Sequence, residues 1–312
     1  MRIGIMAGAT QGSEAALDGL LDKAARVEGQ GFAALWMANI FGLDAITTLA
    51  IAGTRTARIE LGTAVVPTYP RHPVAMAQQA LTAQAACGGR FVLGIGLSHR
   101  IVIEDMFGLS FEKPARHMRE YLEVLQPLLR GEEVRYQGEL FRVAAQFAVP
   151  GTSAPPVLVA ALGPQMLALT GRLADGTITW MCGPRTLEEH VVPSIAAAAR
   201  EAGRGAPRIV AGLPIAVTRN VEEARQKIAV ELQIYGQLPS YRAMLDREGA
   251  GGPADVALVG DENVLASALD RLRDVGVTDF VAAVAAVDGD AEKRTLDFLA
   301  SRLGASGAAA RS

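Results

Sequence analysis

The sequence predicts a closed (β/α)8 barrel of the TIM type, and three observations lead to this fold class. Short apolar stretches alternate with amphipathic helical stretches along almost the whole 312-residue chain. The apolar stretches show no polar alternation, which is typical of parallel strands that are buried on both faces. Eight strand and helix units can be counted, and eight units favour closure into a barrel over an open sheet.

One βαβ unit shows the pattern most clearly. Its strands, residues 59–66 and 91–95, flank a helix that Pro73 opens. Proline suits the first helical turn because its missing N–H would have no partner there. Both strands end in small residues, at 62–64 and 94–96. We therefore expect a large flat ligand to approach the backbone at the carboxyl ends of the strands, where parallel barrels bind their ligands.

The other elements follow in chain order. Further strands are expected at residues 3–7, 33–37, 157–161, 176–181, 208–217 and 279–285. Helices are expected at 13–30, 44–53, 74–86, 114–130, 164–173, 187–202, 221–235, 263–275 and 291–303. In the helix at 114–130, Leu122 and Leu125 are expected to face the core and Glu120 to face solvent.

Three insertions are expected on this barrel. Residues 98–113 follow strand 4, residues 132–149 form a hairpin that turns at Gln137-Gly138, and residues 236–253 follow strand 7. Loops of this length in a compact barrel are usually lids or links. We expect one barrel domain over residues 1–303 and a disordered tail over residues 304–312.

Composition excludes several classes of protein. The net charge of -3 argues against nucleic-acid binding, which usually needs a basic surface. Two cysteines, Cys87 and Cys182, predict neither a disulfide framework nor a metal site, and they fit a reducing cytoplasm. The first strand follows Met1-Arg2 directly, so no secretory signal is expected. The longest uncharged tract, residues 143–171, is broken by prolines and is not expected to cross a membrane.

Three motifs, in this order and spacing, resemble the bacterial luciferase-like superfamily. They are GTAVVPTYPRHPVAMAQQA, GGRFVLGIGLSHR and LVGDENVLASALDRLRDVGVTDFV. Within that superfamily they match best the branch that binds the 8-hydroxy-5-deazaflavin coenzyme F420. The resemblance covers nearly the whole chain. It implies a (β/α)8 barrel with an extended insertion after the helix near residue 130, a flavin or deazaflavin across the carboxyl ends of the strands, and a homodimer packed through the early helices.

The resemblance also implies a set of cofactor-binding residues. Ala64-Val65, after strand three, matches the place where family members hold a non-proline cis peptide behind the ring; an ordinary trans strand end is the alternative. Asn39, after strand two, matches a polar position that hydrogen-bonds the ring; an ordinary turn residue is the alternative. Further contacts are implied along the ribityl chain, at a phosphate site before the helix opened by Pro164, and beside the ring: Gly96, Leu97, Ser98, Ala161, Leu162, Gly163 and Trp180 or Met181.

His99 is the candidate catalytic residue. It follows strand four, where the resemblance implies the ring, and an imidazole with an ordinary pKa of about 6.5 can donate or orient a proton near neutrality. A solvated loop histidine is the alternative. His72 is assigned to a turn, and His117 and His190 fall on helices away from the strand ends, so none of these three is given a catalytic role.

The resemblance leaves three functions open. Sugar-phosphate dehydrogenases of the F420 branch carry a histidine and a glutamate as acid-base groups, where this chain has Ile40 and His99. A reductase is therefore favoured, in which reduced F420 passes a hydride to a small organic substrate. The alternatives are an FMN-dependent monooxygenase and a non-catalytic deazaflavin-binding protein. The substrate is not named by the sequence, although an apolar wall is suggested by Met106, Phe107, Leu109, Tyr235, Leu238 and Tyr241.

Overall fold

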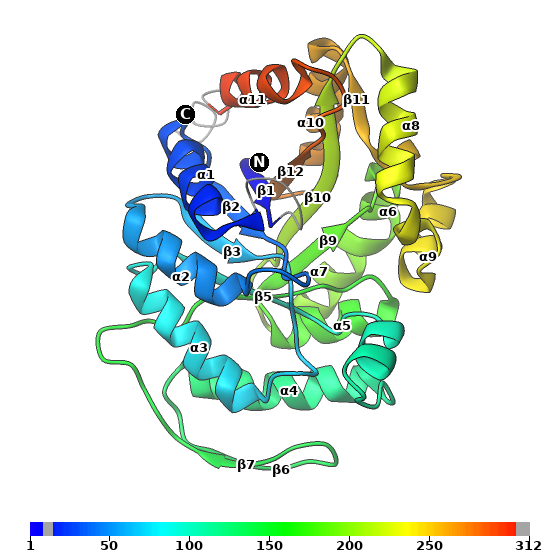
Figure 1. Cartoon of the computed structure of the whole chain (residues 1–312). Helices are drawn as coiled ribbons and strands as arrows, with labels where there is room; N and C mark the ends of the chain where they lie inside the picture. Colours follow the sequence, from blue (N-terminus) through cyan, green and yellow to red (C-terminus); the bar gives the residue numbers. More distant parts are fainter. Residues whose placement is uncertain (9–14, 304–312) are drawn as a thin grey trace.

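The computed structural model describes residues 1–8 and 15–303, so the expected tail at 304–312 and the first two residues of the first expected helix lie outside the described part. Within these residues, eight parallel strands pair side by side and the last pairs with the first, which closes the barrel (Figure 1). In order around the barrel they are β1 (Arg2–Ala7), β2 (Ala34–Met37), β3 (Glu60–Thr63), β5 (Phe91–Gly96), β8 (Val157–Val159), β9 (Gly176–Trp180), β10 (Arg208–Val217) and β12 (Asp279–Val284). The predicted (β/α)8 barrel is confirmed.

The helices form the outer layer of the barrel (Figure 1). The long ones are α1 (Leu17–Gly29), α2 (Ala45–Arg55), α3 (Pro73–Ala86), α4 (Pro114–Leu129), α5 (Pro164–Leu173), α7 (Val192–Glu201), α8 (Val221–Glu231), α10 (Glu262–Asp274) and α11 (Ala291–Ser301). Each of these helices corresponds to a helix expected from the sequence. The agreement follows from the sequence pattern, in which a helical stretch with an apolar stripe accompanies each apolar strand. In the described part of the chain, no helix is both long enough and apolar enough to cross a membrane.

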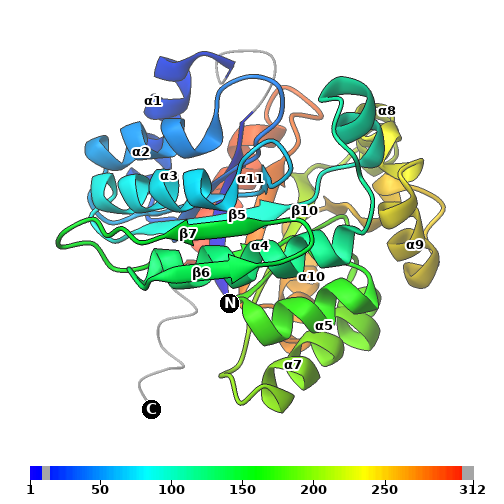
Figure 2. The same ribbon diagram turned by 90° about the horizontal axis from the view of Figure 1, so that it is seen from below.

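The second insertion is a hairpin that lies outside α3 and α4 (Figure 2). Its strands are β6 (Val134–Gln137) and β7 (Arg142–Ala145), and Gln137 pairs with Arg142. The turn therefore spans residues 138–141, whereas the predicted turn was at Gln137-Gly138. Glu120 explains this position, because its carboxylate accepts hydrogen bonds from the backbone N–H groups of residues 139, 140 and 141 at 2.8–3.1 Å. The prediction that Glu120 faces solvent is wrong, since only 2 % of it is exposed.

The other two insertions hold short helices where loops were expected. Residues 98–113 contain a π-helical turn, η2 (Val102–Met106). The third insertion contains α9 (Pro239–Glu248), which follows the 3-10 turn η4 (Gln233–Gly236). Proline at its first position and Gly249 in the left-handed conformation after its end are ordinary helix boundaries. Further short elements are α6 (Pro184–Thr186), η3 (Leu187–Val191), η5 (Pro253–Val256), β4 (Val66–Pro67) and β11 (Leu258–Gly260).

The barrel interior is filled by side chains from alternate positions of the strands. In β2, Ala34 and Trp36 belong to the inner cluster, whereas Leu35 and Met37 pack against the helices. Gly62 makes room for the large indole ring, because a methyl group at residue 62 would lie 2.4 Å from Trp36 ring atoms. One face of an uninterrupted apolar strand thus packs inside the barrel, and the other face packs against the helices, as strands buried on both faces require.

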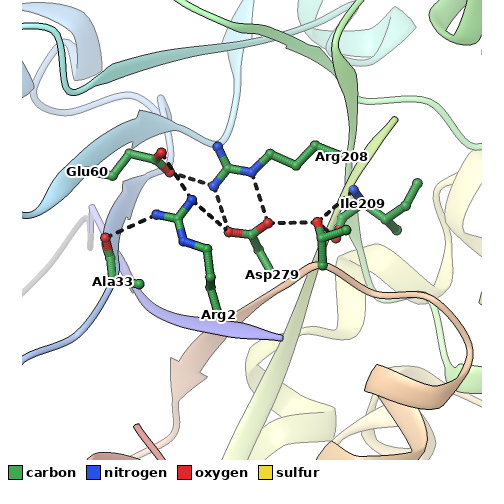
Figure 3. Close-up of polar contacts among 7 residues, drawn as sticks. Arg2, Ala33, Glu60, Arg208, Ile209 and Asp279 are labelled. Carbon is green, nitrogen blue, oxygen red and sulfur yellow. Dashed lines mark hydrogen bonds and ion pairs between the residues drawn. The ribbon is translucent and has the colours of Figure 1, made fainter. Parts of the chain in front are cut away.

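An ion-pair network closes the amino end of the barrel (Figure 3). Arg208 donates to both oxygens of Asp279 at 2.7 and 2.9 Å and to Glu60 at 2.5 Å. Arg2 joins the same two carboxylates at 3.3 and 3.5 Å. Each of the four residues is the first residue of its strand. The ligand-binding end is therefore the opposite one, where the strands finish.

Candidate active site

The chain bulges at the carboxyl end of the third barrel strand. β3 ends at Thr63, β4 begins at Val66, and the peptide between Ala64 and Val65 is cis. The cis form expected at this position is present. Thr63 holds the neighbouring strand in place, because its hydroxyl donates to the Gly94 carbonyl at 2.7 Å and accepts the Gly94 N–H at 2.8 Å.

Two glycines of β5, Gly94 and Gly96, leave room for this bulge. A methyl group at Gly94 would lie 2.0 Å from the Thr63 carbonyl oxygen, and one at Gly96 would lie 2.7 Å from the Val65 side chain. The sequence pattern was interpreted as room for a flat ligand. In the structure, the group that approaches these glycines is the chain's own bulge, and Ala64 and Val65 pack on the inner cluster of the barrel.

Two strand ends carry unusual backbone conformations. Ser98, just after β5, has φ 61°, and Met181, just after β9, has φ 59°. Residues other than glycine rarely adopt the left-handed region, and those that do gather at ligand-binding sites. Both residues had been named from the resemblance, and both lie at the carboxyl end of the barrel. Whether they contact a ligand stays a prediction.

The start of α5 offers unpaired backbone donors. Gly163 is the residue before the helix, Pro164 is its first residue, and no side chain of the described residues caps this end. A side chain at Gly163 would meet nothing within 4 Å, so the space in front of the helix is open. The first N–H groups of a helix lack intrahelical partners and favour anions. The donors therefore fit a phosphate group.

The next helix provides a contrast. α6 also begins with a glycine and a proline, but the carboxylate of Glu248 accepts its first N–H groups, Arg185 at 3.1 Å and Thr186 at 2.7 Å. That end is filled by the protein itself. Of these two neighbouring helix starts, the one at α5 is the one left open.

His190 hydrogen-bonds the loop that directly precedes the open start of α5. Its Nε2 donates to the carbonyl oxygen of Leu162 at 2.7 Å, and only 8 % of the residue is exposed. Sequence reasoning gave His190 no role, because it lies on a helical segment far from any strand end. The link through Leu162 is a tertiary contact without a local sequence signal.

Asn39 is fixed by a contact within its own loop. Its Oδ1 accepts the backbone N–H of Ala45 at 3.0 Å, at the start of α2. Any hydrogen bond from Asn39 to a bound ring would therefore come from Nδ2 as donor. The turn-stabilising role that was weighed as the alternative is present in the structure.

Four aromatic rings form a wall over the strand ends. Trp180 contacts Tyr235 at 6.0 Å between ring centroids, Tyr235 contacts Tyr241 at 5.1 Å, and Tyr241 contacts His99 at 5.7 Å. The wall joins the end of β9 to η4, α9 and the loop after β5. Burial lowers the pKa of His99 below its usual value of 6.5, because the charged imidazolium loses water. His99 is therefore neutral at pH 7.

A separate cavity of about 280 Å³ lies beside this end of the barrel, between the loop after β5, the start of α4 and the hairpin turn. His117 lines it, stacks on Tyr69 at 3.9 Å and places Nε2 3.0 Å from the Thr68 hydroxyl. Burial lowers the pKa of His117 to about 4, so it is neutral. Thr68 follows β4 directly, so His117 supports the segment that carries the bulge.

The structure thus gathers most of the predicted site at one end of the barrel. Val65 and Gly96 approach each other closely, and a methyl group at Gly96 would also lie 3.2 Å from Ala160, which precedes Ala161. His99 and Trp180 are connected through the two tyrosines. Asn39 lies at the same end after β2, in a loop of its own.

Comparison with known proteins agrees with this architecture. The family model described as "Luciferase-like monooxygenase" matches residues 1–292. The chain belongs to the luciferase-like monooxygenase family. Members of this family are oxidoreductases, and so is this protein. The resemblance found in the sequence is confirmed.

Two reductases are among the proteins that this chain resembles. The 5,10-methylenetetrahydromethanopterin reductase of Archaeoglobus fulgidus is 31 % identical over 230 residues, which cover 71 % of this chain and 67 % of that protein. The solved coenzyme F420-dependent tetrahydromethanopterin reductase of Methanopyrus kandleri has a TM-score of 0.79 at 22 % identity and covers 98 % of this chain and 99 % of that one.

A protein solved with FMN shares the same fold. The oxygenating constituent of 3,6-diketocamphane monooxygenase from Pseudomonas putida, solved with FMN, has a TM-score of 0.76 at 15 % identity, covering 97 % of this chain and 98 % of that one. Fold similarity alone therefore does not distinguish a deazaflavin from a flavin.

Proposed function

We propose that this protein is an F420-dependent oxidoreductase that reduces a small organic acceptor. The observation that carries the proposal is the pairing, at one barrel end, of the Ala64–Val65 bulge with the open, uncapped start of α5. The first is a surface against which a ring can lie, and the second is a donor set for a phosphate. The preference for F420 over FMN is supported by two relatives from Mycobacterium tuberculosis, 32 % and 34 % identical, whose names describe them as F420-dependent.

Each residue of the site then has a defined task. The N–H groups at the start of α5 bind the phosphate, with Leu162 and Gly163 forming the approach to them. The bulge supports one face of the ring, and Asn39 donates to it from Nδ2. When bound in reduced form, the deazaflavin supplies a hydride. The chain itself supplies orientation, exclusion of water by the aromatic wall, and a proton from His99.

Reduction is the direction that these residues favour. Removing a proton from an alcohol requires a base, and the loop after β2 presents Ile40, an apolar residue, where dehydrogenases of the branch carry a histidine. His99 remains as the ionisable side chain of the wall. Because burial lowers the pKa of His99 below 6.5, the neutral imidazole that predominates at pH 7 can orient an acceptor through its N–H, and the imidazolium that forms at lower pH is the proton donor.

The experiment is an anaerobic assay of the purified protein with reduced F420 and a panel of carbonyl acceptors, following the reappearance of oxidised coenzyme. Turnover supports the proposal. Consumption of oxygen with reduced FMN, in the absence of F420 turnover, would instead support the FMN-dependent monooxygenase that the diketocamphane enzyme favours as second candidate. Tight F420 binding without hydride transfer to any acceptor would support a coenzyme-binding protein.

Assembly is part of the proposal. We expect a homodimer that packs through the early helices, in line with the resemblance. Sedimentation velocity of the purified protein tests this, and a monomer at micromolar concentration would remove the dimer while leaving the barrel and its site untouched.

A further inference from the structure

The mouth of the barrel carries an unusual share of exposed apolar side chains. Among the described residues, eleven large apolar side chains are exposed, and nine of them lie on the three segments that follow β2, β5 and β10. Two of the nine, Val221 and Val230, belong to the helix α8, and the other seven lie on loops and short helical turns. We call these seven the mouth rim: Ile40, Phe41, Ile101, Met106, Phe107, Leu109 and Ile234. Scattered exposed apolar residues are normal, but a concentration around a ligand-binding end marks a binding surface.

The mouth rim continues the aromatic wall. Ile234 precedes Tyr235 in η4, and Ile101 lies two residues after His99. Burial raises the pKa of both tyrosine phenols, so Tyr235 and Tyr241 are uncharged at neutral pH. The aromatic wall and the adjoining mouth rim therefore present neutral rings and aliphatic and aromatic side chains.

The charges on the loop after β5 do not offer a site for an anion. Arg100 is paired with Glu104, and its guanidinium lies 5.3 Å from the Phe111 ring. The same loop carries two further carboxylates, Asp105 and Glu112, which would repel an anionic acceptor, and its other cation, Lys113, is paired with Glu139. The electrostatics of this segment thus agree with its apolar surface.

We propose that the acceptor is an uncharged, largely apolar carbonyl compound whose hydrocarbon part packs on the mouth rim. This inference rests on the proposed function. In the reaction, the electrophilic carbon of the carbonyl or of its conjugated double bond gains a hydride, the other end of that bond gains a proton, and the coenzyme is oxidised by two electrons. A substrate anchored by a phosphate or carboxylate is not what this mouth binds.

The test begins with binding, which does not depend on turnover. Affinities of n-alkanols from butanol to decanol for the protein loaded with oxidised F420, measured by calorimetry, are expected to rise two- to fourfold per methylene; full burial gives about fourfold. Alkanoates of equal length are expected to bind at least about tenfold more weakly, because a carboxylate loses water without gaining a partner. If the affinity does not change with the chain length of the alkanol, or if alkanoates bind with equal affinity, the inference is overturned.

A matched pair of variants tests whether the alkanols bind at the mouth rim. Ile234 and Val264 are equally exposed, at 55 % and 54 %, but Val264 lies on α10 outside the mouth rim. Ile234→Ser is expected to weaken decanol binding about three- to tenfold, and Val264→Ser to leave it unchanged. Equal loss in both variants, or no loss in either, contradicts the placement.

Turnover then separates this inference from the proposed function. With reduced F420, kcat/KM for 2-alkanones is expected to rise along the same series. If charged carbonyl compounds are reduced in preference, the proposed function stands and the inference falls. If alkanols bind with the expected slope and no carbonyl compound is reduced, the apolar site stands and the proposed function falls.

Discussion

His190 Nε2 donates a 2.7 Å hydrogen bond to the carbonyl oxygen of Leu162, one residue before the glycine that precedes α5. The bond orients a loop whose donors are the proposed phosphate site. His190→Ala is expected to weaken binding of F420 about tenfold, because a mobile loop must be ordered on binding. Binding of the deazaflavin fragment that lacks the phosphate is expected to change little.

The ratio of those two affinities separates positioning from general damage. His190→Gln retains a donor that can reach Leu162 and is expected to restore part of the affinity. Glu248→Gln, which perturbs the filled start of α6, serves as control and should leave the ratio unchanged. Equal loss for both ligands in His190→Ala would show a structural role only.

Gly94 is expected to be required by the bulge itself. In Gly94→Ala, the new methyl group would lie 2.0 Å from the Thr63 carbonyl oxygen, so the strands must separate. Overpacking of this kind typically costs about 1–3 kcal/mol of unfolding free energy. Urea unfolding measures the loss, with Gly205→Ala, where a methyl group meets nothing within 4 Å, as control. Equal stability of the two variants would contradict the packing argument.

His99 is expected to act on the chemical step. His99→Ala should lower kcat by about a hundredfold to ten-thousandfold with little change in coenzyme affinity, as general acid catalysis predicts. Because burial lowers the pKa of His99 below 6.5, the neutral imidazole predominates at pH 7 and the protonated imidazole becomes abundant only at more acidic pH. If that form is the donor, wild-type activity falls as pH rises through this lowered pKa, and His99→Ala loses the decline. Near-full activity with an unchanged pH profile would rule out the catalytic role.

The network at the amino end is expected to stabilise the barrel without touching the site. Asp279→Ala leaves Arg208, whose side chain is 18 % exposed, with Glu60 alone. Removing one partner of a buried pair typically costs about 3 kcal/mol. Asp297→Ala, in an exposed pair with Lys293, should cost less than about 1 kcal/mol. Thermal unfolding compares the two, and F420 affinity should be unchanged in both.

The barrel was predictable because its signals are local and repeated. Each unit pairs an uninterrupted apolar run with an apolar helical stripe, and single prolines, Pro73, Pro114 and Pro164, mark helix starts. Elements without such a pattern were missed. The burial of Glu120 depends on a hairpin that returns to it from 19 residues further along, and no periodicity reports such a contact.

The site was only partly predictable for the same reason. Ala64-Val65, Ser98 and Met181 lie at strand ends, which the sequence locates, whereas their backbone conformations depend on what packs beside them. Gly94 and Gly96 were correctly seen as places of close approach, but the approaching group is the chain's own bulge. His190 and His117 act through other residues, so their own sequence neighbours reveal nothing about them.

The identity of the coenzyme can be determined by a competition titration. Purified protein is titrated with F420 and with FMN, and then with one in the presence of the other, following ligand fluorescence. The account predicts that F420 binds more tightly and displaces FMN. Equal or tighter binding of FMN would contradict it.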